Sequence, residues 1–247
     1  MNILNVAAYR FVELDRLPEL RAAFRARGEE LGLKGTILVA TEGINLFLAG
    51  EAGNVEAFLE TLQADARFAA IEVKRSWSVG QPFSRLLVKV KREIVSMQRP
   101  EFHPRESPAP RIAPRELKRW LDEGRDLVLL DTRNQFEVDL GTFENARSLG
   151  LKSFSDFPRA TPALPEALKH ATIVTFCTGG IRCEKAAPWL VSRGYREVYQ
   201  LDGGILNYFE QCGSAHFRGN CFVFDQRVAL DACLRQADTT PGRTPSH

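Results

Sequence analysis

The segment most able to carry chemistry is residues 177–184, which read Cys-Thr-Gly-Gly-Ile-Arg-Cys-Glu. An apolar run ends at Cys177, and the two glycines that follow let the backbone fold tightly around the sulfur. Successive amides can then point inward at one anion, beside the positive end of a helix, and Arg182 can add a cation at the rim. These surroundings stabilise a thiolate, the nucleophilic form of cysteine. We predict that Cys177 is catalytic and that its anion-binding loop consists of Thr178, Gly179, Gly180, Ile181 and Arg182.

The cysteines of this segment also have simpler interpretations. A free cysteine at a strand end is often only a small buried hydrophobe, but the glycines and Arg182 favour the reactive interpretation of Cys177. Cys183 could act as a resolving thiol for an oxidised Cys177, although a structural role is favoured. Four residues lie between Cys177 and Arg182, one fewer than in phosphatases of the Cys-x5-Arg type, which disfavours phosphatase activity.

Such a loop needs a buried sheet behind it, and the second half of the chain predicts one. Strands are expected at residues 127–130, 173–176 and 197–200, and helices at 117–121, 184–192 and 205–210. Short apolar strands that alternate with helices are typical of a parallel sheet covered on both faces. Ligands of such sheets bind beyond the carboxyl ends of the strands, which is where Cys177 falls.

The first half of the chain has a different order of elements. Strands are expected at residues 3–8, 36–40, 45–49, 71–74 and 87–91, and helices at 17–31 and 55–62. This βαββαβ order predicts a ferredoxin-like α+β domain at residues 1–98. A proline-rich stretch predicts a linker at 99–113, followed by an α/β domain at 114–212 and a C-terminal extension at 213–247 that is disordered at its end.

Composition places few limits on function. The chain has 247 residues, 44% of them hydrophobic and 26% charged, and a net charge of +2 that is too mild to indicate nucleic-acid binding. No run approaches the roughly 18 apolar residues of a membrane span, and no signal-peptide pattern is present, so we expect a cytoplasmic protein with no membrane partner. The odd number of cysteines, 5, does not suggest a disulfide framework. Cys212, Cys221 and Cys233 lack zinc-site spacing, so no metal site is predicted.

The string of residues 177–186 resembles the active-site loop of rhodanese domains. The resemblance continues in residues 129–137, 141–146 and 199–205. It implies a rhodanese-like α/β domain with a parallel central sheet at residues 114–212. Asp131, Arg133 and Cys183 are then expected to support the loop, although the first two could be ordinary polar residues at a strand end.

Residues 35–45, 88–95 and 219–228 extend the resemblance to the rhodanese-containing tRNA uridine hydroxylase family, over nearly the whole chain. Members of that family hydroxylate the wobble uridine of tRNA at C5 with dioxygen and require the loop cysteine. The resemblance therefore implies an enzyme that uses O2 and an unknown electron donor and acts on the anticodon region. This chain departs from the family at Leu46 and Phe47, where Gly-Thr is usual, and in lacking a tail rich in cysteine pairs.

Basic residues late in the first domain favour a polyanionic partner. The candidates for RNA binding are Lys74, Arg75, Arg85, Lys89, Lys91 and Arg92, with Trp77 and Phe83 nearby. Strand alternation places Lys89 and Lys91 on one face. Cations would neutralise phosphates and rings could stack on unpaired bases, and the alternative is a solvated strand face with core aromatics. With the family resemblance, tRNA is the expected partner and DNA is not.

Two other functions compete with tRNA hydroxylation. A sulfurtransferase that carries a persulfide on Cys177 would need only the short loop, and a non-catalytic RNA-binding or sulfide-sensing module would need no chemistry. Oxygen chemistry usually recruits a metal or a flavin, but the four histidines lack ligand spacing and no flavin fingerprint is present, so no bound cofactor is predicted. The sulfur could add to uracil C6, carry a persulfide or react with an oxidant.

Overall fold

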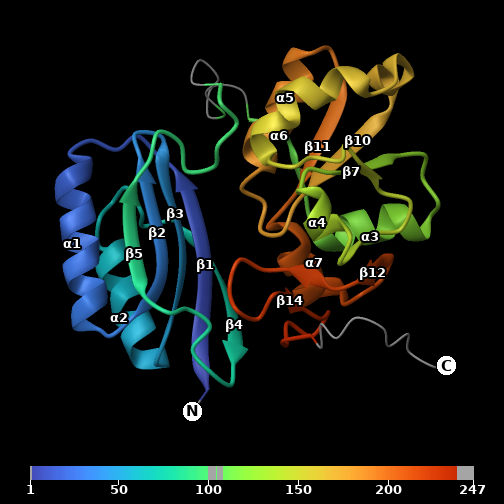
Figure 1. The fold of residues 1–247 in the computed structure, drawn as a ribbon. Helices are drawn as coiled ribbons and strands as arrows, with labels where there is room; N and C mark the ends of the chain where they lie inside the picture. Colours follow the sequence, from blue (N-terminus) through green and yellow to red (C-terminus); the bar gives the residue numbers. More distant parts are fainter. Residues whose placement is uncertain (1, 100–103, 105–107, 238–247) are drawn as a thin grey trace.

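The computed structural model describes residues 2–99, 104 and 108–237, and two α/β units lie side by side in it (Figure 1). The first unit has a five-stranded sheet with the strand order β4-β1-β3-β2-β5. Its elements are β1 (Ile3–Phe11), α1 (Leu17–Glu30), β2 (Lys34–Ala40), β3 (Gly43–Gly50), α2 (Ala52–Gln63), β4 (Glu72–Ser78) and β5 (Leu86–Val90). The order β4-β1-β3-β2 of a βαββαβ unit confirms the ferredoxin-like prediction. An additional strand, β5, pairs in parallel with β2 at the edge.

The two faces of this first sheet have different neighbours. Side chains alternate along a strand, so Leu4, Val6 and Ala8 of β1 enter the core beneath α1 and α2. The residues that alternate with them, among them Ala7 and Tyr9, therefore belong to the opposite face. Figure 1 shows both helices on one side of the sheet and the second unit on the other. The face without helices is thus the one that meets the second unit.

The second unit is built on another five-stranded sheet, with the order β6-β11-β10-β7-β9. Its elements up to the last helix are β6 (Arg111–Ile112), α3 (Pro114–Asp122), β7 (Val128–Asp131), α4 (Gln135–Val138), β8 (Gly141–Phe143), β9 (Arg147–Ser148), α5 (Phe157–Ala160), β10 (Thr172–Phe176), α6 (Cys183–Ser192), β11 (Glu197–Leu201) and α7 (Gly204–Cys212). All four strand pairs in the sheet are parallel, as the sequence predicts.

Apolar side chains bury both faces of this parallel sheet. Ile173 of β10 packs in a cluster with Ala186 of α6, and the next residue, Val174, packs in a second cluster with Leu117 of α3 and Ile205 of α7. A strand buried on both faces has no polar alternation. This explains why the strand that leads to Cys177, Thr172–Phe176, carries no charged residue and does not alternate between apolar and polar side chains.

The segments that flank the second unit contribute to it. β6 lies at the end of the stretch predicted as a linker, residues 99–113, and pairs with β11. In the C-terminal extension, β12 (Phe217–Gly219) pairs with β8, and β13 (Cys221–Phe222) pairs with β14 (Ala229–Leu230). The extension is thus described through residue 237, while the predicted disorder at its end, and residues 100–103 and 105–107 of the predicted linker, fall outside the described residues. No helix in the described part of the chain is long and apolar enough to cross a membrane.

A buried ion cluster fastens the two units to each other. Lys185 of α6 is 1% exposed and its Nζ lies 2.9 Å from a carboxylate oxygen of Glu42 and 2.7 Å from one of Glu93. The same Nζ donates to the carbonyl oxygen of Val95 at 3.0 Å. Glu42 follows β2 and Glu93 follows β5, so both acids belong to the first unit. We call these three charged residues the Lys185 triad.

Candidate active site

Cys177 lies directly after β10, in the middle of the parallel sheet and before the first turn of α6. This is the position that the sequence predicts for a ligand site in such a sheet. The amide of Gly180 donates a hydrogen bond to the Cys177 sulfur at 3.1 Å. Gly180 has a φ of +99°, a conformation that side chains disfavour, so a glycine is needed where the loop closes around the sulfur.

The start of α7 holds this loop from behind. The amide of Ile205 donates to the carbonyl oxygen of Cys177 at 2.9 Å, and the amide of Leu206 donates to that of Thr178 at 3.1 Å. Gly204 has a φ of +67°, and a Cβ at this position would lie 2.4 Å from the Cys177 carbonyl oxygen. Two parts of the chain that are distant in sequence therefore meet backbone to backbone, with no space for a side chain between them.

The surroundings of Cys177 favour its ionised form. Burial opposes ionisation, but the hydrogen bond from Cys183, the Arg182 guanidinium and the amides of Arg182 and Gly180 outweigh it. Together they lower the pKa of Cys177 to about 6. At neutral pH the sulfur is then a thiolate, the form that attacks electrophiles.

Cys183 is fully buried on the first turn of α6 and stays protonated. Burial and the charge of Cys177 raise its pKa, and its thiol donates the hydrogen bond to the Cys177 sulfur. Its own sulfur lies 3.8 Å from the Thr132 hydroxyl. This geometry fits the supporting role expected of Cys183, because its thiol donates a hydrogen bond to the Cys177 thiolate and keeps its own proton.

Two buried ion pairs lie around the loop: Arg133 with Asp131, and Arg182 with Glu137. Arg133 binds Asp131 at 2.6 Å and donates to the Gly141 carbonyl oxygen, so both residues stabilise the end of β7 and do not touch the sulfur. Arg182 binds Glu137 at 2.9 Å and is 7% exposed, so it is more enclosed than the rim position expected from the sequence. Sequence reasoning missed Glu137. Its spacing from Asn134 is that of a helix capping box, which signals where α4 begins but not the ion pair with Arg182.

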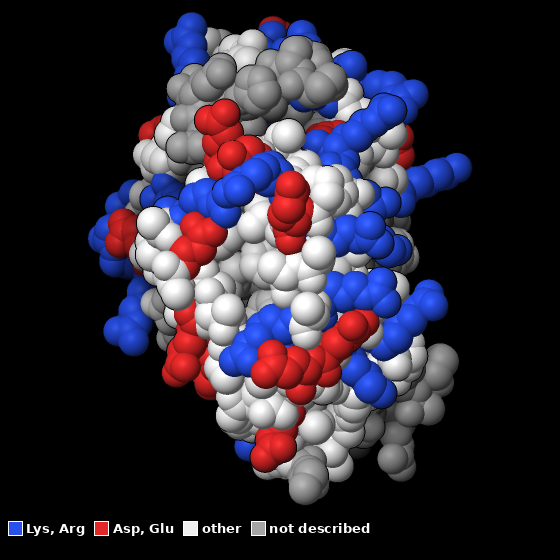
Figure 2. All heavy atoms as spheres, turned by 90° about the vertical axis from the view of Figure 1, so that its left-hand side faces the viewer, with Lys and Arg blue, Asp and Glu red and all other residues white. Residues whose placement is uncertain are grey.

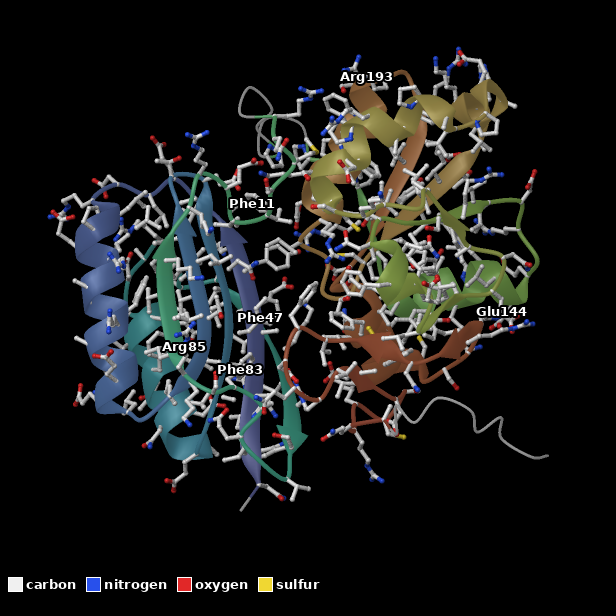
Figure 3. All side chains as sticks on the ribbon, in the orientation of Figure 1. Phe11, Phe47, Phe83, Arg85, Glu144 and Arg193 are labelled. Atoms are coloured by element: carbon white, nitrogen blue, oxygen red, sulfur yellow. The ribbon has the colours of Figure 1, made fainter. Side chains whose placement is uncertain are left out.

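A cavity of about 240 Å³ opens in front of the loop, between the two units. On one side it is lined by Cys177, Thr178, Gly179, Ile181 and Arg182 of the loop. On the other it is lined by β1, β3 and β4 of the first sheet, and six residues of the C-terminal extension between 223 and 234 also contribute to the lining. Figure 3 shows Phe47 of β3 on the side of the sheet that faces the second unit. The sulfur, although 1% exposed by residue, therefore faces an interdomain cavity.

The first sheet places two polar groups near the sulfur. The Tyr9 hydroxyl donates to Glu184 at 3.0 Å, and a Cβ on Gly180 would lie 2.9 Å from the same hydroxyl. Burial and the negative charge of Glu184 raise the pKa of Tyr9, which keeps it a donor. The Lys74 Nζ lies 5.6 Å from the centre of the Tyr9 ring, and burial lowers its pKa while nearby negative charges, including Cys177, oppose that effect. Sequence reasoning named Lys74 only as a phosphate contact and missed Tyr9.

The structure does not bring the six basic candidates together. Lys74 and Arg75 lie on or beside the cavity on β4, but the Arg75 guanidinium pairs with Glu56 of α2 at 2.9 Å. The other four, Arg85, Lys89, Lys91 and Arg92, lie on or next to β5 at the opposite edge of the sheet. Arg85 stands on that edge in Figure 3, away from the second unit. Figure 2 views the molecule from the side of α1, where basic and acidic side chains are interspersed.

Within the described residues, no group of three or more histidine, cysteine, aspartate or glutamate side chains is arranged to hold a metal ion. Burial raises the pKa of Cys221 to about 12, so this thiol stays neutral in the core. Cys212 is half-buried and Cys233 is exposed. None of these three cysteines lines the cavity in front of Cys177, and their structural role stays a prediction.

The fold and site define a class of protein: a rhodanese-like domain with a loop cysteine of lowered pKa, preceded by a small α+β domain. Residues 113–211 match the rhodanese-like domain family, and residues 3–94 match the family described as UPF0176 acylphosphatase-like domain. The chain is 54% identical over 242 residues to a tRNA uridine(34) hydroxylase of Cupriavidus necator, covering 96% of this chain and 86% of that protein. It is 53% identical over 240 residues to the protein of the same name in Bordetella petrii, covering 95% of each.

A third relative, from Variovorax paradoxus, also bears the name tRNA uridine(34) hydroxylase and is 52% identical over 245 residues, covering 96% of this chain and 93% of that protein. Identity at this level over nearly the full length of both proteins goes beyond a shared rhodanese fold. The chain belongs to the tRNA uridine(34) hydroxylase family, as the resemblance implied.

Proposed function

We propose that this enzyme hydroxylates C5 of the wobble uridine of tRNA, and that Cys177 is the residue that reacts with the base. One observation carries the proposal: a cysteine whose pKa is lowered to about 6 faces an interdomain cavity of about 240 Å³. A space of this size suits a single nucleobase and not a folded RNA. Enzymes that act on one base commonly extrude it from its stack into such a pocket.

The arrangement supports addition of the Cys177 thiolate to C6 of the uracil ring. The S–C6 bond forms as the electron pair of the C5–C6 double bond moves toward C5 and the O4 oxygen, which gives an enolate. Lys74 lines the same cavity as Cys177 and interacts with its charge, and no carboxylate of the described residues forms an ion pair with this lysine. A positive charge here would stabilise the developing oxyanion.

The enolate makes C5 electron-rich, so this carbon can be oxidised by dioxygen. One oxygen atom is retained on C5 and the other leaves as water, which requires two electrons and two protons from a donor. Loss of the C5 proton and expulsion of the thiolate from C6 then restore the uracil ring and free Cys177. In this scheme the loop amides hold the negative charge of the sulfur before attack and after release.

The test compares cells that lack the gene and express either the wild type or one variant, Cys177→Ala. We expect 5-hydroxyuridine and nucleosides derived from it to be present with the wild type and absent with Cys177→Ala, as measured by mass spectrometry of digested tRNA. Cys233→Ala is the matched control, because Cys233 is exposed and distant in sequence from the loop. Undiminished 5-hydroxyuridine in the gene-deleted cells would contradict the proposed function.

The sulfurtransferase alternative predicts a different outcome in the same strains. The purified wild type would then transfer sulfur from thiosulfate to cyanide through Cys177, and 5-hydroxyuridine would not depend on that cysteine. A separate experiment tests the addition step. RNA that carries 5-fluorouridine at the target position should form a denaturation-resistant adduct with the wild type and none with Cys177→Ala.

A further inference from the structure

Four phenylalanine rings form a continuous row from the cavity to the surface. Phe47 of β3 lies 6.2 Å from Phe224, and Phe224 lies 5.0 Å from Phe222, both measured between ring centroids. Phe222 in turn lies 5.1 Å from Phe136 of α4. The last two contacts are edge-to-face, at interplanar angles of 88° and 87°, which is a favourable arrangement of aromatic rings. We call these four residues the phenylalanine row.

One end of the row lies in the catalytic cavity and the other is open to solvent. Phe47 and Phe224 line the cavity, whereas Phe136 is 49% exposed. Phe224 belongs to both regions, since it lines the cavity and is 44% exposed. Half-exposed large rings cost hydration free energy, and side by side they mark an interaction surface more often than isolated ones do.

The row is fixed to the catalytic loop and to the first sheet. The Thr178 hydroxyl donates to the Phe222 carbonyl oxygen at 3.3 Å, and the Arg182 guanidinium lies 5.4 Å from the centre of the Phe224 ring. Arg227, three residues beyond Phe224, donates to the Ser76 hydroxyl of β4 at 2.9 Å. The rings are therefore held at defined distances from Cys177, as a positioning surface requires.

We propose that the phenylalanine row is a stacking platform for the unpaired nucleobases next to the target uridine. The inference rests on the proposed function: a uridine whose base enters the cavity stays covalently joined to its neighbours, which must then lie at the cavity entrance. Aromatic side chains bind unpaired bases by stacking, and they do so with little dependence on base identity. Because the row is continuous with the cavity, the bases next to the target uridine are the ones that would lie on it.

The row differs from the aromatic residues that the sequence suggested. Trp77 is 51% exposed, but it alternates on β4 with Lys74 and Ser76, which line the cavity, so its ring points to the other side of the sheet. Phe83 is half-buried and lines the cavity wall. Trp77 is thus about as exposed as Phe136 but lies on the other side of the sheet from the cavity, so it serves as a matched control.

The experiment uses the full chain and an anticodon stem-loop RNA in which the nucleotide next to the target uridine is 2-aminopurine, whose fluorescence falls when it stacks. With the wild type we expect quenching on binding. With Phe136→Ala and with Phe224→Ala we expect less quenching and binding weakened by about 5- to 100-fold, the range that corresponds to the loss of one base–ring stack. Phe136→Trp should restore both signals, and Trp77→Ala should leave both unchanged.

The salt dependence of binding separates stacking from charge effects. Loss of a ring removes no cation, so the slope of log Kd against log salt should equal that of the wild type while the affinity falls at every salt concentration. Phe136 is half-exposed, so its truncation tests the proposal even if Phe224→Ala does not fold. Sedimentation of the free proteins tests whether the row joins two copies of the chain, and an altered oligomeric state in Phe136→Ala would overturn the proposal.

Unchanged quenching and unchanged affinity in both alanine variants would also overturn it. The two proposals fail separately. If the wild type hydroxylates tRNA and the variants bind RNA normally, only the stacking platform is wrong. If cells that lack the gene keep their 5-hydroxyuridine, the proposed function is wrong whatever the fluorescence reports.

Discussion

The two walls of the Cys177 cavity are built in different ways. The loop wall comes from one short run of the chain: backbone amides, the Cys183 thiol and the Arg182 guanidinium stabilise the sulfur, and the amides of Ile205 and Leu206 hold the loop carbonyls from behind. The sheet wall is made of side chains from strands that are distant in sequence, among them Tyr9, Phe47 and Lys74. The Lys185 triad joins the two walls.

This difference indicates a division of roles. The loop stabilises a thiolate whatever the substrate is, because its amides, the Cys183 thiol and the Arg182 guanidinium act on the sulfur and not on a base. The side-chain wall decides what fits in front of the sulfur and which charges it meets. Substitutions in the loop should therefore affect reactivity and folding, and substitutions in the sheet wall or at its edges should affect which RNA binds and how tightly.

The largest expected effect comes from breaking the contact between the walls with Lys185→Met. The substitution leaves Glu42 and Glu93, which are 17% and 12% exposed, without their cation. Removing one partner of a buried ion pair costs about 3–5 kcal/mol, so we expect the free energy of unfolding in urea to fall by about that amount. Lys169→Met is the control, because Lys169 forms a surface pair with Glu166 whose loss costs about 0–1 kcal/mol.

The pH dependence of this variant sharpens the same test. Burial would raise the pKa of Glu93, but Lys185 and backbone amides hold it below its usual value. A lowered carboxyl pKa stabilises the fold at pH values above the unfolded pKa, and this contribution is lost as the pH falls through the folded pKa. The stability difference between wild type and Lys185→Met should narrow in acid. If the difference in unfolding free energy stayed constant from pH 7 to pH 3, the ion pair between Lys185 and Glu93 would not contribute to stability as described.

The next effect concerns the loop wall and its thiolate. With a pKa near 6, Cys177 should react with iodoacetamide at a rate that rises with pH and reaches half its plateau near pH 6. At that pH the reaction should be about one order of magnitude faster than for a thiol with an ordinary pKa near 8.5, because the larger thiolate fraction is partly offset by the lower nucleophilicity of a low-pKa thiolate. Peptide mass spectrometry locates the label, and Cys233→Ser removes an exposed competitor. A half-maximal alkylation rate at pH 8 or above would mean that the loop does not stabilise the Cys177 thiolate.

A smaller effect should follow when the back of the loop is changed by Gly204→Ala. The added Cβ would meet the Cys177 carbonyl oxygen at 2.4 Å and the Gly180 amide nitrogen at 2.7 Å. Strain and overpacking of this kind cost about 1–3 kcal/mol, which thermal unfolding should report. Gly179→Ala is the matched control in the same loop, because a Cβ there meets nothing within 4 Å. Equal losses in the two variants would mean that the loop is not braced as described.

The same contrast explains how far the sequence could predict the molecule. The conformation of the loop was predictable because it lies in one run, residues 177–183, and its glycines indicate a tight turn of the backbone; its chemistry stays a prediction. The parallel sheet and the βαββαβ unit were predictable from local apolar patterns. Tyr9, Glu137 and the phenylalanine row were not, because their roles arise only when distant segments pack together. For the basic candidates the sequence misleads in the opposite way. They are near one another in sequence and suggest one cluster, but they lie on or next to β4 and β5, at opposite edges of one sheet.

The smallest effect is expected at that far edge, from the double variant Lys89→Ala, Lys91→Ala. Lys89 pairs with Leu38 of β2, which pairs with Asn45 of β3, so Lys89 shares the sheet face that carries the cavity-lining Asn45. If phosphates of the tRNA cross this edge, each lost contact should lower the slope of log Kd against log salt by about 0.7–0.9 and weaken binding by a few fold at low salt.

The control for this edge is Arg25→Ala, Arg27→Ala, which removes the same charge from α1 on the opposite face, where both arginines pair with glutamates. Its salt slope should match that of the wild type. If the two double variants lose equal affinity and equal slope, only net charge matters and the β5 edge has no particular role. If only Lys89 and Lys91 change the slope, the tRNA path runs from the β5 edge across the helix-free face to the cavity, and the sheet wall guides the RNA while the loop wall reacts.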